Sequence, residues 1–135
     1  MHIHIHDGIS IGQIKQIFND FYPFLKLEFF REPHARFELS SELSRIPDHI
    51  TIRNIHKDAK HDGTIEIHPT QTVGNVEKRF QTDFALPVQV YWIQKGKWVQ
   101  TDSMDAFTLK EVNELSKNDS DEFLIEDYEE GFEDE

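Results

Sequence analysis

The segments "HIHIHDGISIGQIKQIF" (residues 2–18) and "TIEIHPTQTVGNVEKRF" (residues 64–80) share one layout, and this repetition decides the fold. A shift of 62 residues aligns apolar and polar positions of the two segments. The aligned pairs include Ile3 with Ile65, Ile5 with Ile67, His6 with His68, Ser10 with Thr72, Ile14 with Val76, and Phe18 with Phe80. Agreement in both residue type and spacing indicates an internal duplication.

Each copy has the pattern of a strand, a helix and a second strand. Alternating apolar and polar residues open each segment, which is typical of a half-buried strand. Ser10 and Thr72 then stand where a helix N-cap is expected, and Gln13 completes a capping box with Ser10. Apolar residues follow at helical spacing, and "LKLEFF" (25–30) and "VQVYWI" (88–93) return to strand character. We therefore expect two equivalent units, 1–31 and 63–93.

The remaining segments predict two hairpins and a last helix. "HITIRN" (49–54) has strand character and leads through the turn "HDGT" (61–64) into the second unit. "YWIQKGKWVQT" (91–101) predicts another hairpin that turns near Lys95–Gly96. Thr108 and Glu111 form a capping box for a short helix that is expected to end near Lys117.

The order of elements over residues 49–115 resembles the ubiquitin-like β-grasp. The resemblance is carried by short stretches: "TIEIHP" from Thr64, Thr72-Val73, Leu86-Pro87, Gly96-Lys97 and Thr108-Leu109. It implies an α+β fold in which the two related units form a mixed sheet with helices on one face. A duplicated ferredoxin-like sandwich is the alternative. The chain also resembles small bacterial proteins of the Bacteroidetes type with a TVxxLExxF…VQV segment, a likeness that implies no activity.

One feature of ubiquitin-like modifiers is missing. Conjugation and sulfur transfer in that family use a C-terminal Gly-Gly, whereas this chain ends "EEGFEDE" with Gly131 alone. The resemblance therefore implies a binding module, and fold alone does not establish a function.

Charge is distributed unevenly along the chain. Residues 118–135 hold ten of the 26 acidic groups and no basic ones, which leaves 16 acidic and 14 basic residues in the first 117. Binding of nucleic acid or anionic membranes needs clustered Lys and Arg, so we expect neither ligand. We expect residues 1–117 to form one domain and 118–135 to be a disordered acidic tail. The lack of cysteine and of a long apolar run favours a soluble, cytoplasmic protein.

The alternating histidines are a candidate metal site. His2, His4 and His6 project from one face of the expected strand, with Ile3 and Ile5 on the other. Neutral imidazole binds zinc and other divalent transition metals, but further ligands would have to come from elsewhere in the chain. A solvated strand face is the favoured interpretation, and we expect no cofactor.

Two segments are candidate partner-binding surfaces. In the second hairpin, Gln89, Tyr91 and Ile93 should point away from the core side, and Trp98 on the return strand should join them. In the tail, Phe123, Leu124, Tyr128 and Phe132 are interleaved with carboxylates. No catalytic constellation is recognisable, so we expect a non-catalytic protein–protein interaction or adaptor module whose partner has a basic surface. A metal-binding protein that uses the N-terminal histidines is the alternative.

Overall fold

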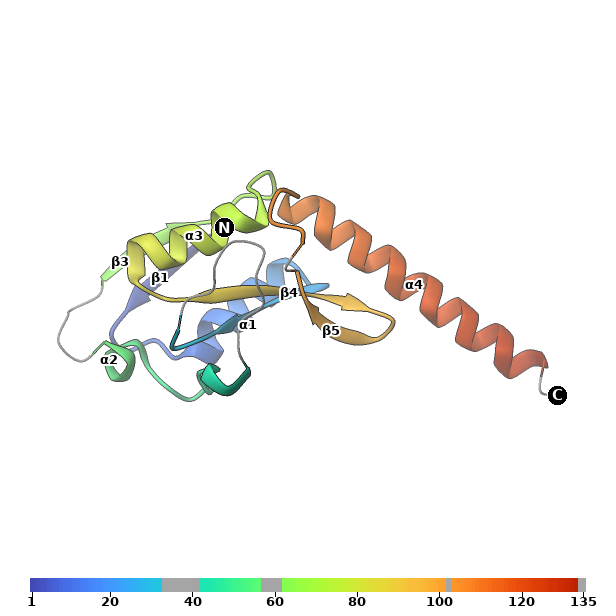
Figure 1. Ribbon diagram of the computed structural model, residues 1–135, viewed down its shortest axis with the longest axis horizontal. Helices are drawn as coiled ribbons and strands as arrows, with labels where there is room; N and C mark the ends of the chain where they lie inside the picture. Colours follow the sequence, from blue (N-terminus) through green and yellow to red (C-terminus); the bar gives the residue numbers. More distant parts are fainter. Residues whose placement is uncertain (33–41, 57–61, 102, 134–135) are drawn as a thin grey trace.

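The structure is a computed structural model and describes residues 1–32, 42–56, 62–101 and 103–133, with side chains up to Glu122. Its elements, in chain order, are β1 (His2–His6), α1 (Ile11–Phe21), β2 (Leu25–Phe29), η1 (Glu42–Ser44), α2 (Ile52–Ile55), β3 (Asp62–Glu66), α3 (Val73–Phe84), β4 (Val88–Gln94), β5 (Lys97–Gln100) and α4 (Leu109–Glu133) (Figure 1). The predicted α+β class is confirmed. No helix within the described ranges is long and apolar enough to cross a membrane.

The two units contact each other through equivalent strands. β1 pairs with β3, β2 pairs with β4, and both pairs are antiparallel. In these ladders Ile3 lies opposite Ile65, and Leu27 lies opposite Val90. Each of these pairs joins equivalent positions of the two units, so the strand pairing follows an approximate twofold relation.

The two main helices begin where the sequence predicts. At α1, the Gln13 N–H donates to Ser10 Oγ (3.1 Å) and the Ser10 N–H donates to Gln13 Oε1 (2.9 Å), which confirms the capping box. At α3, Thr72 Oγ1 accepts a hydrogen bond from the Asn75 N–H (3.1 Å). Each cap satisfies a main-chain donor that has no partner within the helix itself.

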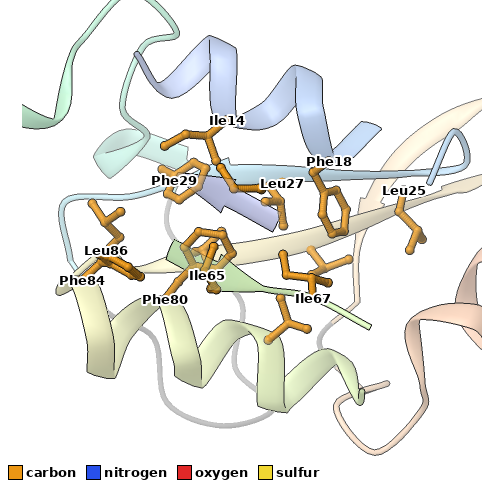
Figure 2. Packing of buried hydrophobic residues seen from close by; sticks show 14 of the residues in the cluster. Ile14, Phe18, Leu25, Leu27, Phe29, Ile65, Ile67, Phe80, Phe84 and Leu86 are labelled. Atoms are coloured by element: carbon orange, nitrogen blue, oxygen red, sulfur yellow. The ribbon is translucent and has the colours of Figure 1, made fainter. Parts of the chain in front are cut away.

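The core lies between α1 and α3. Figure 2 shows Ile14 and Phe18 of α1 and Phe80 and Phe84 of α3 approaching the strands from opposite sides. The rings of Phe29 and Phe80 meet edge to face with their centroids 5.5 Å apart. Complete burial of each such side chain contributes about 1.5–3 kcal/mol, so these contacts hold the two units together.

The prediction of a strand at 49–54 is wrong. Ile52–Ile55 form the short helix α2, and β3 takes β1 as its partner in place of a local hairpin. The preceding residues accept hydrogen bonds from the first turn of α1: the Ile11 N–H donates to Ile50 O (2.9 Å) and the Gly12 N–H donates to Asp48 O (2.8 Å). These tertiary bonds override the local strand preference.

The expected sheet and the expected last helix also need correction. In the described ranges the strands form two antiparallel sheets, β1–β3 and β2–β4–β5, and not one mixed or ferredoxin-like sheet. α4 does not end near Lys117 but continues to Glu133, so its backbone is helical through most of the acidic segment. Disorder of this segment in solution stays a prediction.

Candidate interaction surface

The β4–β5 hairpin has the predicted turn. Gln94 pairs with Lys97, which leaves Lys95 and Gly96 as a two-residue loop with φ angles of 51° and 77°. Positive φ at both loop residues is typical of the type I′ turn, whose twist matches that of the flanking strands. The hairpin therefore holds Ile93 and Trp98 directly opposite each other, as their pairing register shows.

Two of the four expected surface residues of this hairpin are buried. Gln89 has no exposed surface and Tyr91 is 4% exposed, so the prediction that both lie on an exposed surface is wrong. The Tyr91 hydroxyl donates to Glu42 Oε1 (2.7 Å) and accepts a hydrogen bond from the Arg45 guanidinium (3.2 Å). Burial is the largest cause that raises the pKa of Tyr91, and the hydrogen bond to Glu42 adds to it.

A buried carboxylate explains why this face of the sheet is covered. Glu28 lies opposite Gln89 in the β2–β4 ladder, and its side chain is almost fully buried. One carboxylate oxygen, Oε1, lies 2.8 Å from Lys15 Nζ, 3.3 Å from Lys26 Nζ and 3.7 Å from the Arg45 guanidinium. A buried charge needs such partners, so these cations stay close to the sheet.

The outer end of the hairpin remains accessible. Trp98 is 38% exposed, Val99 is 43% exposed, and Ile93 is half-buried. The Lys26 ammonium lies 5.1 Å from the Trp98 ring centroid, within the range of a cation–π contact. Of the expected hairpin surface, Ile93 and Trp98 therefore remain accessible.

α4 joins this end of the hairpin. Leu109 and Val112 are fully buried in the core, and Ser116, one turn later, also has no exposed surface. Asp119 still contacts the hairpin, and the C-terminal part of the helix then extends away from the body (Figure 1). The expected partner-binding residues Phe123, Leu124, Tyr128 and Phe132 lie on this extension, and their side chains are outside the described part of the structure.

The histidine face of β1 contacts carboxylates from β3. His4 Nε2 lies 2.7 Å from Asp62 Oδ1, and Glu66 Oε1 lies 3.8 Å from His2 Nδ1 and 3.6 Å from His68 Nε2. His6 Nδ1 accepts a hydrogen bond from the Gly8 N–H (3.2 Å). Among the described residues, no group of three or more His, Asp or Glu side chains is arranged to hold a metal ion. The strand pairing brings together residues that are about 60 positions apart, which the sequence alone did not indicate.

A buried acid in α3 was not identified from the sequence. Glu77 is 6% exposed, and its Oε2 accepts the Val90 N–H (2.9 Å). Burial, the largest cause, raises the pKa of Glu77 to about 8, with Asp105 adding to the shift and the Val90 bond opposing it. The signal available in the sequence was the position of Glu77 on the helix, directly after the buried Val76.

Comparisons of this chain with protein-family models, with curated proteins and with solved structures found no match.

Proposed function

We propose that this protein is a small, non-catalytic interaction module that binds a protein partner through the end of α4 and the accessible end of the β4–β5 hairpin. The observation that carries the proposal is the extension of α4 beyond the body (Figure 1). A helix that continues past its last buried turn gains little from its own domain, because most helical stability in proteins comes from tertiary packing.

The composition of the extension supports a protein partner. Leu124, Tyr128 and Phe132 follow one another at intervals of four residues, the spacing that places positions on one side of a helix. The segment 118–135 also carries ten acidic groups and no basic ones. A partner groove that is apolar at its floor and lined by Lys and Arg at its rim would match both features. The opposite charges would also accelerate the encounter.

The hairpin supplies the second part of the surface. Trp98 and Ile93 are opposite each other, and the Lys95 N–H at the turn donates to Asp119 Oδ2 of α4 (2.6 Å). The hairpin and the helix are therefore held next to each other at the base of the extension. The proposal does not use the β-grasp resemblance, since the segment expected as a strand at 49–54 leads into the helix Ile52–Ile55. A cytoplasmic location stays a prediction.

The test is an affinity capture from lysate of the source cells followed by reconstitution with the purified partner. Three baits are compared: the full chain, the chain truncated after Lys117, and a full-length variant with Phe123, Leu124, Tyr128 and Phe132 replaced by Ser. The Ser variant keeps every carboxylate, so it separates apolar recognition from charge. We expect a direct partner whose dissociation constant rises at least tenfold in both variants and whose association slows at high salt.

Two results would contradict the proposal. A partner that binds the truncated chain as tightly as the full chain would exclude α4 as the binding element. Failure of the full chain to bind any purified candidate directly would exclude the interaction module itself. Trp98→Ala in the full chain then measures how much the hairpin contributes to the affinity for the partner, with Lys78→Ala on the exposed side of α3 as the control.

A further inference from the structure

The last residues of β4 have an edge that β2 does not cover. β2 begins at Leu25, which pairs with Trp92, so Ile93 lies one residue beyond the β2–β4 ladder. Its main chain contacts α4 instead: the Ile93 N–H donates to Ser116 Oγ (2.8 Å). The single proton of the Ser116 hydroxyl is shared between Phe24 O (2.9 Å) and Ile93 O (3.1 Å). Ser116 thus replaces a neighbouring strand at this edge.

Two further side chains of α4 bind main-chain groups next to this edge. Asn113 Oδ1 accepts the Phe24 N–H (3.2 Å), and Asp119 Oδ2 accepts the Lys95 N–H (2.6 Å). Asn113, Ser116 and Asp119 are spaced by three residues, so they lie along one side of the helix. The main-chain groups of Phe24, Ile93 and Lys95 together form what we call the seat of α4.

The seat holds the helix by polar contacts. Leu115, the apolar residue between Asn113 and Ser116 that could add packing, is 44% exposed. The net stabilisation from hydrogen bonds to main-chain groups is small, because water takes over the same groups when the contact opens. The contrast with Leu109 and Val112, which are fully buried, places the change from apolar to polar anchoring after Val112.

The charge of the helix end also opposes a permanent contact. The last turn of α4 has no basic residue, and the segment that precedes it is acidic. Carboxylates near a helix C-terminus repel the negative end of the helix dipole and promote fraying.

We propose that residues 113–133 of α4 form a strap that opens from its seat while Leu109 and Val112 stay in the core. Opening frees the N–H groups of Ile93 and Lys95 at the edge of β4, and it leaves the C=O of Ile93 with the Gln94 side-chain amide, whose Nε2 lies 3.1 Å away. It also moves the acidic extension away from the hairpin. The strap goes beyond the proposed function and does not depend on it, since the seat opens with or without a partner.

Native-state hydrogen exchange, measured by NMR on the full chain, tests the strap. The amides of Phe24, Ile93 and Lys95 report on the seat. The amide of Ile46, which donates to Phe29 O (2.8 Å), reports on the body. We expect the seat amides to exchange at least tenfold faster than Ile46 in the unmodified protein. Ser116→Ala should accelerate the seat amides a further tenfold or more and leave Ile46 unchanged.

Ser120→Ala is the matched control. Its hydroxyl lies on the same helix, is buried and has no hydrogen-bond partner among the described residues, so its removal should leave all four amides unchanged. Equal exchange of seat and body amides in the unmodified protein would show that the seat opens only on global unfolding, and this would overturn the strap. Acceleration of Ile46 together with the seat amides in Ser116→Ala would overturn it as well.

Discussion

The two units carry side chains of opposite charge at equivalent positions of their helices. Lys15 is the fifth residue of α1, and Glu77, 62 positions later, is the fifth residue of α3. Each faces an aspartate whose main-chain carbonyl accepts a hydrogen bond from the second residue of the helix: Gly12 bonds Asp48, and Gly74 bonds Asp105. The backbone frame is thus the same in both units, while the side chains within it differ.

In the first unit the aspartate has a cation. Lys15 Nζ lies 2.7 Å from Asp48 Oδ1 and 2.8 Å from Glu28 Oε1. Burial lowers the pKa of Lys15, but its hydrogen bonds to Asp48 and Glu28 outweigh burial and raise this pKa above its usual range. In the second unit Glu77 faces Asp105, and a proton on Glu77 relieves the repulsion between the two acids. One frame can therefore hold an ion pair or a protonated acid.

The largest expected effect tests whether both units support the core equally. Phe18 and Phe80 occupy equivalent positions, and both are fully buried. Replacement of either by Ala should lower the free energy of unfolding by about 3–5 kcal/mol, and by similar amounts, because each ring meets a second aromatic ring: Phe18 meets Tyr22, and Phe80 meets Phe29. Urea unfolding followed by circular dichroism measures both variants, and Phe→Leu provides a milder pair if Ala prevents folding. A loss of stability in only one of the two variants would contradict a core that both units share.

The second effect is a pH dependence that belongs to the second unit. The pKa of Glu77 is about 8 in the folded protein and close to 4.5 when the chain is unfolded. As pH rises, the unfolded chain therefore loses the Glu77 proton at a lower pH than the folded protein does. The contribution of this proton to the free energy of unfolding is complete below about pH 4.5 and is lost as pH rises through about 8. We expect the free energy of unfolding to fall by about 2–5 kcal/mol between pH 5 and pH 9.

Glu77→Gln is the matched variant for the pH measurement. The amide keeps an oxygen for the Val90 N–H and adds a donor for Asp105, but it does not titrate. Its free energy of unfolding should lack the loss between pH 5 and pH 9 in chemical denaturation at each pH. An equally steep loss in this variant would assign the pH dependence to other groups.

The glycines in the shared frame should show a smaller effect. A Cβ at Gly12 would lie 3.2 Å from Asp48 O, and a Cβ at Gly74 would lie 3.0 Å from Asp105 O. Gly→Ala at either position should destabilise the protein by about 1–2 kcal/mol, because crowding exceeds the gain in helix propensity. Thermal unfolding measures both, and Gly74 should be the more sensitive. Stabilisation by either substitution would show that the aspartate turn moves away freely.

The smallest effect concerns the ion pair of the first unit. Lys15→Met keeps an unbranched side chain, one atom shorter, and removes its charge. Glu28 retains Lys26 and Arg45 nearby, and Asp48 is largely exposed, so we expect a loss of about 1 kcal/mol. Urea unfolding should give free energies of unfolding for Lys15→Met and the unmodified protein that differ less at high salt than at low salt. A loss above about 3 kcal/mol would show that Glu28 depends on Lys15 alone.

Local signals in the sequence were sufficient for the helices and the second hairpin. Ser10 with Gln13 and Thr72 at the two helix starts, and Lys95–Gly96 at the turn, act within a few residues of themselves. The outward alternation of Gln89, Tyr91 and Ile93 was also readable from the strand period. Their exposure was not, because the groups that cover Tyr91 come from Glu42 and Arg45, almost fifty residues away in the chain.

What the sequence determined by itself was the layout of two related strand–helix–strand units, their caps and the uneven charge of the chain. The tertiary structure decided which strands pair, since β1 and β3 form hydrogen bonds with each other although they lie about 60 residues apart in the chain. The residues before α2 then accept hydrogen bonds from the first turn of α1. The tertiary structure also decided that Glu77 is buried beside Asp105 and that Ser116 closes the edge of β4. The physical reason is the same in each case: local propensities differ by about 1 kcal/mol or less, and the satisfaction of buried polar groups by distant residues outweighs them.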